Sequence, residues 1–238
     1  MPGFSIWDVY GTQEYLTPGA AETLDLIDRT FELEDGALVL DVAYGRGSGA
    51  LRLAARGWRV LGVDTHPFAV QVARGAGARA LGERAAFVTG DGGALPVRDG
   101  VCDAAICIGG PSIIGTQRCL RAMHRALRRG GWLAVSDWMW RSVPVPPDAI
   151  PAGYGIEPLT ADGYAALVRG LGFEVAHASA LPREAWDAYY APIRPRVAEL
   201  RAAHADTPPQ PIEAELRAWD SGIGAAWWRY GVVIARRR

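Results

Sequence analysis

A strand that ends in an acid and leads directly into a glycine-punctuated turn constrains this chain more than any other stretch. The segment runs from Leu38 to Leu51 and reads LVLDVAYGRGSGAL. Glycine allows a tight turn and lets a ligand lie against backbone N–H groups with no Cβ in the way. The small-residue helix that follows directs its partly positive N-terminus at the same place. The segment therefore predicts a ligand site at the end of this strand.

Strands and helices alternate from residue 20 to about residue 180, which is typical of a parallel sheet with helices on both faces. Leu120, Met123 and Leu127 repeat at helical spacing and predict a helix over residues 116–129. The predicted strands are Leu38–Val42, Arg59–Val63, Ala86–Thr89, Cys102–Ile108, Trp132–Ser136 and Glu174–Ala178. The chain is therefore predicted to be an α/β protein.

Three segments interrupt the alternation. Residues 1–19 are aromatic and irregular, and residues 182–228 suggest two helices separated by the proline-rich stretch 207–211, followed by a strand at 230–235. Residues 138–160 contain prolines that exclude a regular helix or strand. These prolines are Pro144, Pro146, Pro147, Pro151 and Pro158.

Composition narrows the class of partner. Lys and Arg together number 25 and Asp and Glu 26, so the net charge of −1 gives no broad reason to expect nucleic acid or an acidic membrane surface. The three cysteines form no CxxC pair and have no histidine cluster beside them, so buried free thiols and no metal site are expected. We find no secretory signal and no apolar run near ~18 residues. We therefore expect a cytoplasmic protein with no membrane span.

Acids follow three successive strands, at the edge where parallel sheets bind ligands. Asp64 lies roughly 20 residues after the glycine turn and suits a ribose diol, a spacing that NAD-binding folds share. Asp41, before the turn, would repel a pyrophosphate but attract an ammonium group. Asp91, beside Gly92, can accept a hydrogen bond from an adenine amino group. The ordered set favours S-adenosylmethionine (SAM) over a dinucleotide.

The turn resembles the first motif of the class I SAM-dependent methyltransferases, commonly Asp-x-Gly-x-Gly-x-Gly. Asp41, Gly45 and Gly47 match this motif, whereas Ala43 replaces its first glycine. Further segments resemble a small UbiE-like bacterial subgroup of that family. These segments are residues 15–19, 127–133, 186–190 and 230–235.

The resemblance implies a three-layer, Rossmann-like, seven-stranded, mostly parallel sheet with an antiparallel last strand, helices on both faces and an inserted helical cap. It implies one methyltransferase domain over residues 1–238, comprising an N-terminal lid (1–19), a cofactor-binding core (20–180), a helical insertion (182–228) and a final strand (229–235). The expected cofactor is SAM. The residues expected to bind it are Tyr15, Asp41, Ala43, Gly45, Gly47, Asp64, Thr65, Asp91, Gly92 and Ile108.

The methyl acceptor is expected to be a small molecule of unidentified structure. Methyl transfer mainly needs positioning, so no universal catalytic residue is expected. Asp137 is the best-placed base for a hydroxyl acceptor, with His66 and Glu14 as further candidates. Aromatic side chains in the irregular segments either line the substrate pocket or form the core of the cap. The pocket candidates are Tyr10, Trp138, Trp186 and Tyr190.

Two other functions stay open on the sequence. An NAD(P)-dependent oxidoreductase would share the turn and Asp64, but the chain has no lysine and so no Tyr-x-x-x-Lys pair. A SAM-binding protein without catalytic activity is the other, suggested by Ala43 and Tyr44 in the turn. The oligomeric state, monomer or homodimer, is also open.

Overall fold

Seven strands form one sheet in the order β3-β2-β1-β4-β5-β7-β6. The computed structural model describes residues 3–67, 69, 71–73, 75, 84–151, 157, 159–208 and 210–238. Strand β7 runs antiparallel to both β5 and β6, whereas the pairs among β1 to β5 are all parallel. The strands are β1 (Leu38–Val42), β2 (Arg59–Asp64), β3 (Ala85–Thr89), β4 (Cys102–Ile108), β5 (Leu127–Trp140), β6 (Phe173–Ala180) and β7 (Trp228–Arg237). The predicted fold class is confirmed.

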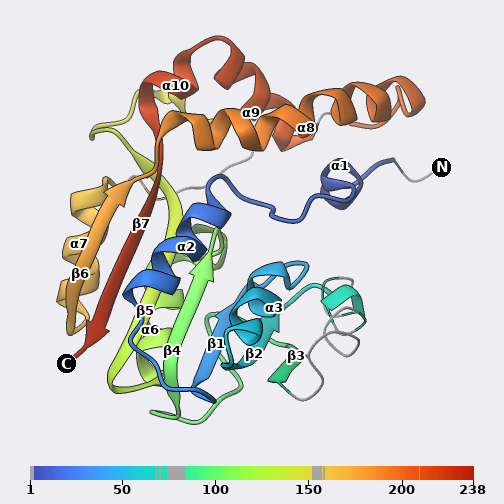
Figure 1. Ribbon diagram of the computed structural model, residues 1–238. Helices are drawn as coiled ribbons and strands as arrows, with labels where there is room; N and C mark the ends of the chain where they lie inside the picture. Colours follow the sequence, from blue (N-terminus) through green and yellow to red (C-terminus); the bar gives the residue numbers. More distant parts are fainter. Residues whose placement is uncertain are drawn as a thin grey trace.

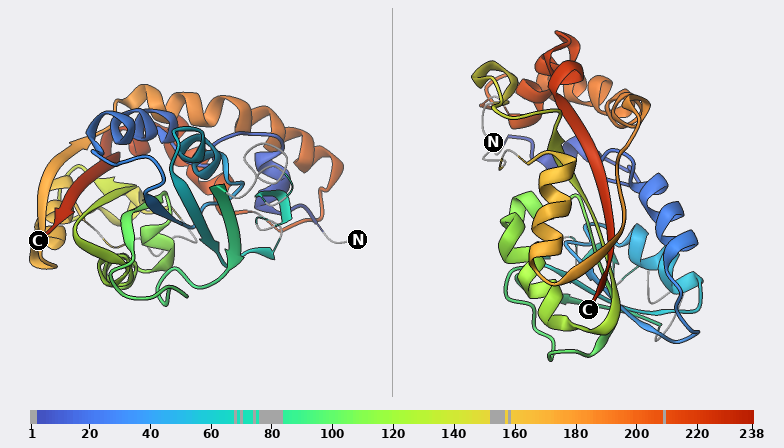
Figure 2. Two further views of the ribbon diagram at one scale, coloured as in Figure 1. Left: turned by 60° about the horizontal axis from the view of Figure 1, so that its bottom comes forward. Right: turned by 90° about the vertical axis from the view of Figure 1, so that its left-hand side faces the viewer.

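Helices cover both faces of the sheet, as Figure 2 shows for α6 and α7 on one side and α2 and α3 on the other. Leu120 and Met123 of α6 pack into one core, and Leu24 and Ile27 of α2 pack into the other; all four are fully buried. The helices of these layers are α2 (Ala20–Thr30), α3 (Ser48–Ala55), α6 (Thr116–Ala126) and α7 (Ala161–Gly170). The sheet is therefore the middle of three layers.

A helical cap lies across the end of the sheet at which β4 finishes (Figure 1). It consists of α8 (Arg183–Ala203), α9 (Pro211–Asp220) and α10 (Ile223–Trp227), and the short helix α1 (Ile6–Tyr10) lies beside α8. Two short helical segments, α5 (Pro111–Ile114) and a 3-10 turn (Pro147–Ala149), follow β4 and β5.

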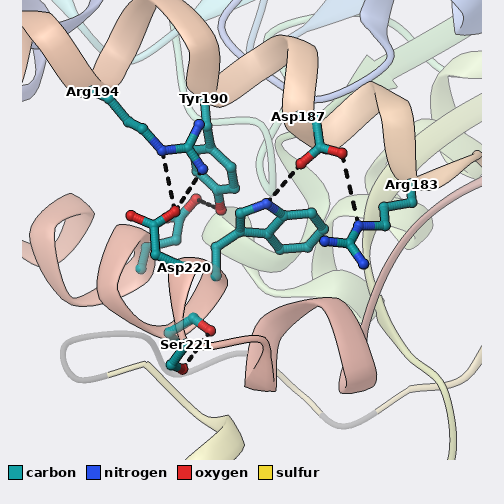
Figure 3. Close-up of polar contacts among 9 residues, drawn as sticks. Arg183, Asp187, Tyr190, Arg194, Asp220 and Ser221 are labelled. Atoms are coloured by element: carbon teal, nitrogen blue, oxygen red, sulfur yellow. Dashed lines mark hydrogen bonds and ion pairs between the residues drawn. The ribbon is translucent and has the colours of Figure 1, made fainter.

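Aromatic packing and buried hydrogen bonds hold the cap helices together. Trp186 of α8 stacks on Trp219 of α9, with ring centroids 5.3 Å apart. The Trp219 indole N–H donates to Asp187 over 2.9 Å, and the Tyr190 hydroxyl donates to Glu215 over 2.5 Å. Figure 3 shows these two hydrogen bonds beside the ion pairs that Arg183 and Arg194 make with Asp187 and Asp220. The cap is thus a packed layer with its own apolar core.

Three details differ from the sequence predictions. Strand β5 extends from residue 127 to 140, so the preceding helix ends at Ala126 and residues 138–140 are strand instead of loop. The reason is β7, which pairs with β5 from Trp132 to Trp140 and prolongs it. The insertion contains three helices instead of two, because α10 follows α9. Of the prolines expected to prevent regular structure, Pro158 lies outside the described residues.

None of the helices in the described ranges is long and apolar enough to cross a membrane.

Candidate functional site

The turn between β1 and α3 forms the floor of a cavity of about 310 Å³. Its backbone turns through left-handed conformations at Ala43, Gly45 and Gly47, with φ of 57°, 57° and 82°. Ala43 is the single non-glycine residue with positive φ in the described part of the chain. Its methyl group fits because Gly110 lies opposite: a Cβ on Gly110 would lie 2.7 Å from the Cβ of Ala43. The substitution of the first motif glycine is therefore accommodated by a second glycine across the turn.

Asp64, the last residue of β2, is oriented by backbone donors. Its Oδ2 accepts a hydrogen bond from the Gly45 N–H over 2.9 Å, and its Oδ1 accepts one from the His66 N–H over 2.8 Å. Each carboxylate oxygen can accept more than one hydrogen bond. The acid is therefore fixed at the cavity wall with acceptor capacity left for a ligand.

Asp41 differs from Asp64 in that its carboxyl group is buried without a hydrogen-bond donor in the described part of the chain. The residue is only 4% exposed, it lines the same cavity, and no described residue donates a hydrogen bond to its carboxylate. Burial, together with the nearby charge of Asp64, raises the pKa of Asp41 to about 8. A buried carboxyl without a donor is costly to ionise, so a cationic partner in this cavity would bind it favourably.

The structure brings most of the predicted cofactor residues together, but not two of them. The predicted residues that line the cavity are Tyr15, Asp41, Ala43, Gly45, Asp64, Thr65, Gly92 and Ile108. Gly47 instead caps α3 and faces Ala73. Asp91 pairs with Arg118 of α6 and accepts the Gly93 N–H over 2.8 Å, and the pKa of Asp91 is lowered by these contacts. In this structure Gly47 and Asp91 therefore do not reach the cavity.

Several lining residues were not among the predicted site residues. They come from the lid, from the turn between β1 and α3 and from the segment after β4, and include Ile6, Arg46 and Ile113. The aromatic residues of segment 1–19 were the sequence signal that could have identified the lid as part of the site. Trp7 is one of these residues and lines the cavity. The Trp7 indole N–H donates to Nε2 of His66 over 3.1 Å and so ties the lid to the end of β2.

A second cavity, of about 640 Å³, adjoins the first and opens beneath the cap. The two cavities share six lining residues, which are Ile6, Tyr10, Leu16, Thr17, Gly109 and Ile113. Of the predicted pocket residues, Tyr10, Trp138 and Trp186 line this cavity. Tyr190 does not, because its ring packs behind Trp186 and its hydroxyl donates to Glu215. Trp138 and Trp186 also belong to the cap core, so these rings line the cavity and pack within the cap as well.

Asp137 lies at the wall of the second cavity and is 2% exposed. Its Oδ1 accepts hydrogen bonds from the Ser112 hydroxyl over 2.7 Å and from the Trp138 N–H over 2.8 Å. Burial raises the pKa of Asp137 to about 7, although these hydrogen bonds oppose the rise. A carboxyl that titrates near neutrality can exchange a proton with a bound molecule. No cluster of metal-ligating side chains occurs among the residues that the structure describes.

Comparison with known proteins agrees with this geometry. Residues 39–131 match the model of a methyltransferase domain family. A SAM-dependent methyltransferase from Geobacter sulfurreducens, solved with S-adenosyl-L-homocysteine, superposes with a TM-score of 0.80 at 22% identity over 100% of both chains. The [4+2]-cyclase SpnF superposes with a TM-score of 0.74 at 23% identity over 98% of this chain and 93% of that one. The fold is therefore that of the class I methyltransferases.

A curated relative matches over a shorter stretch. The tRNA (uracil(54)-C(5))-methyltransferase of Pyrococcus horikoshii is 38% identical over 53 residues, which is 22% of this chain and 13% of that protein. The chain thus covers only a small part of the length of this relative. The domain match covers residues 39–131, less than half of the chain, and the solved structures share the fold.

Proposed function

We propose that this chain is a SAM-dependent methyltransferase that methylates a small molecule. The observation that carries the proposal is the Asp41 carboxyl, buried at the glycine turn and without a protein donor among the described residues. The amino-acid end of SAM carries an ammonium group, which is the partner that such a carboxylate needs. A dinucleotide would bring a pyrophosphate to the same carboxylate and be repelled.

The remaining cavity residues also fit SAM. Asp64 retains acceptor capacity for a ribose diol, and glycines leave room for flat or bulky groups. Gly92 and Gly109 line the cavity, and a Cβ on either would collide with the side chain of Ile114 or Thr17, which line it as well. When bound, SAM supplies a methyl group on a sulfonium centre. The chain supplies position: the turn holds one end of the cofactor, and the lid residues Tyr15 and Thr17 exclude water from it.

The shape of the second cavity supports a small acceptor. The lid and the cap helices cover the strand ends, so the acceptor would bind in a cavity of about 640 Å³ beneath the cap. We extend the proposal to membership of the UbiE-like subgroup, because the lid and residues 127–133 resemble that subgroup. We also propose a reducing, cytoplasmic setting, because all three cysteines are buried free thiols.

The fold alone does not fix the chemistry, because a cyclase shares it. A SAM-binding protein without methyl transfer is therefore the second candidate, and the left-handed alanine of the turn motivates it. Release of S-adenosylhomocysteine from SAM in the presence of an acceptor separates the two candidates, because only a methyltransferase forms it.

Calorimetry with S-adenosylhomocysteine tests the proposal. We expect binding at micromolar strength, weakened at least tenfold by Asp64→Ala, since that carboxylate also orients the Gly45 and His66 backbone. Asp206→Ala, at an exposed position away from both cavities, is the matched control and should bind like the wild type. Absence of binding by the folded wild-type protein, or binding of NADH in its place, would refute the proposal.

A further inference from the structure

The ionisable side chains that line the second cavity include two carboxyl groups and no basic group among the described residues. Two buried carboxyl residues line it, Asp137 on β5 and Glu215 on α9, exposed by 2% and 4%. Among the described residues that line it, none is a lysine, arginine or histidine. Arg194 of α8 does not line the cavity; it pairs with Asp220 over 2.7 Å and lies over the Tyr190 ring (Figure 3). The ionisable groups of opposite sign are therefore missing from the described lining, and its carboxyl groups are Asp137 and Glu215.

Aromatic rings form much of the remaining wall. They come from the lid, from two strands and from α8, and are Tyr10, Trp138, Trp186, Tyr189 and Tyr230. The hydroxyls of Tyr10 and Tyr189 share a hydrogen bond of 3.1 Å, which joins the lid to the cap at the wall of the cavity. The faces of Trp and Tyr rings attract cations, most strongly where water is excluded. Rings and carboxylates thus select for the same kind of ligand.

The tyrosines of the wall report on the field that a ligand would meet. Burial raises the pKa of Tyr10 to about 12, and the charge of Glu215 contributes to the rise. Burial and the charge of Asp137 likewise raise the pKa of Tyr230 well above its usual value. A phenolic acceptor would be held neutral by the same environment, and a carboxylate or phosphate would be repelled. A positively charged group is the one ionic form that this cavity stabilises.

We propose that the acceptor is an amine carried on an apolar or aromatic body, bound in its ammonium form between Asp137, Glu215 and the aromatic wall. This inference rests on the proposed function. Asp137 lies on the cofactor side, because its donor Ser112 adjoins Ile113, which lines both cavities.

Asp137 then has a defined role in the reaction. Its carboxylate takes one proton from the ammonium group, which frees the lone pair of the nitrogen. The nitrogen forms a bond to the methyl carbon as the S–C bond breaks, and the electron pair of that bond stays on sulfur. The product nitrogen carries the positive charge, which the rings and Glu215 continue to stabilise.

Three probes that share a phenylethyl body test the proposal: 2-phenylethylamine, 2-phenylethanol and 3-phenylpropionate. Each is titrated by calorimetry into the wild-type protein, with and without saturating S-adenosylhomocysteine. We expect the amine to bind at least tenfold more tightly than the alcohol and the acid not to bind at millimolar concentration. Asp137→Asn and Glu215→Gln should each reduce the preference for the amine at least threefold, whereas Asp206→Asn should leave it unchanged.

The selectivity of the wild-type protein decides the question even if a variant fails to fold. Equal binding of amine and alcohol, tighter binding of the acid, or no binding of the amine overturns the proposal. Failure of the proposed function is a separate result, because it shows as absence of S-adenosylhomocysteine binding whatever the probes do. With SAM present, mass spectrometry should find the N-methylated amine and no methyl ether of the alcohol.

Discussion

Replacing Asp41 with asparagine should raise the free energy of unfolding and lower the affinity for the cofactor. The amide has the same shape but no charge, so Asp41→Asn removes the cost of ionising a buried carboxyl. Stability and affinity should therefore move in opposite directions, which a merely structural aspartate would not produce.

The sign follows from the pKa of Asp41, about 8 in the folded protein against 3.8 ordinarily. Between these values the folded protein holds a proton that the unfolded chain releases, so the stability of the wild type falls as pH rises from about 4 to about 8. At about 1.36 kcal/mol per pH unit, the advantage of Asp41→Asn should grow by up to ~4 kcal/mol between pH 5 and pH 8. Water in the cavity lowers this figure, and ~2 kcal/mol is the smallest growth that the reasoning allows.

Urea unfolding followed by tryptophan fluorescence measures the difference, because the chain has nine tryptophans. Wild type, Asp41→Asn and the exposed control Asp206→Asn are compared at pH 5 and pH 8 without ligand. S-adenosylhomocysteine affinity is measured at pH 8 on the same samples and should fall at least tenfold in Asp41→Asn. A stability difference that does not change with pH, or a variant less stable than wild type at pH 8, would refute the account of this carboxyl.

Two further substitutions test the packing of the first cavity and of the cap. Gly92→Ala would place a Cβ 2.6 Å from Cδ1 of Ile114 and 2.8 Å from Cγ1 of Val42, so unfolding should cost about 1–3 kcal/mol less and cofactor affinity should fall; an unchanged urea midpoint would contradict this. Tyr190→Phe removes the hydroxyl that donates to buried Glu215 and should lower stability by about 1–3 kcal/mol while cofactor affinity stays within twofold of wild type. A large loss of cofactor affinity in Tyr190→Phe would place that residue nearer the cofactor than the structure does.

Local pattern was sufficient to locate the short buried strands. The strands β1 and β4 have the predicted bounds, because a short apolar run between turn residues is determined by its own sequence. The extension of β5 to Trp140 was not predictable in this way. It depends on pairing with β7, which lies about ninety residues further along the chain.

In the site, too, local sequence determined some features and contacts between distant residues determined others. Asp41 and Asp64 were located by their positions at strand ends, which the topology alone sets. Asp91 was placed at the right edge, but its carboxylate turns to Arg118, a partner on a helix that no spacing rule connects to it. Trp186 and Tyr190 were both predicted to line the pocket and stack on one face of α8, yet only Trp186 reaches the cavity, because α9 covers Tyr190.

A crystal grown with S-adenosylhomocysteine tests the central claim most directly. The account predicts density in the cavity between Tyr15, Asp41 and Asp64, with the ammonium group beside Asp41 and the ribose at Asp64. Density that places the ribose or the ammonium group away from these carboxylates, or a cavity without ligand at saturating concentration, would contradict it.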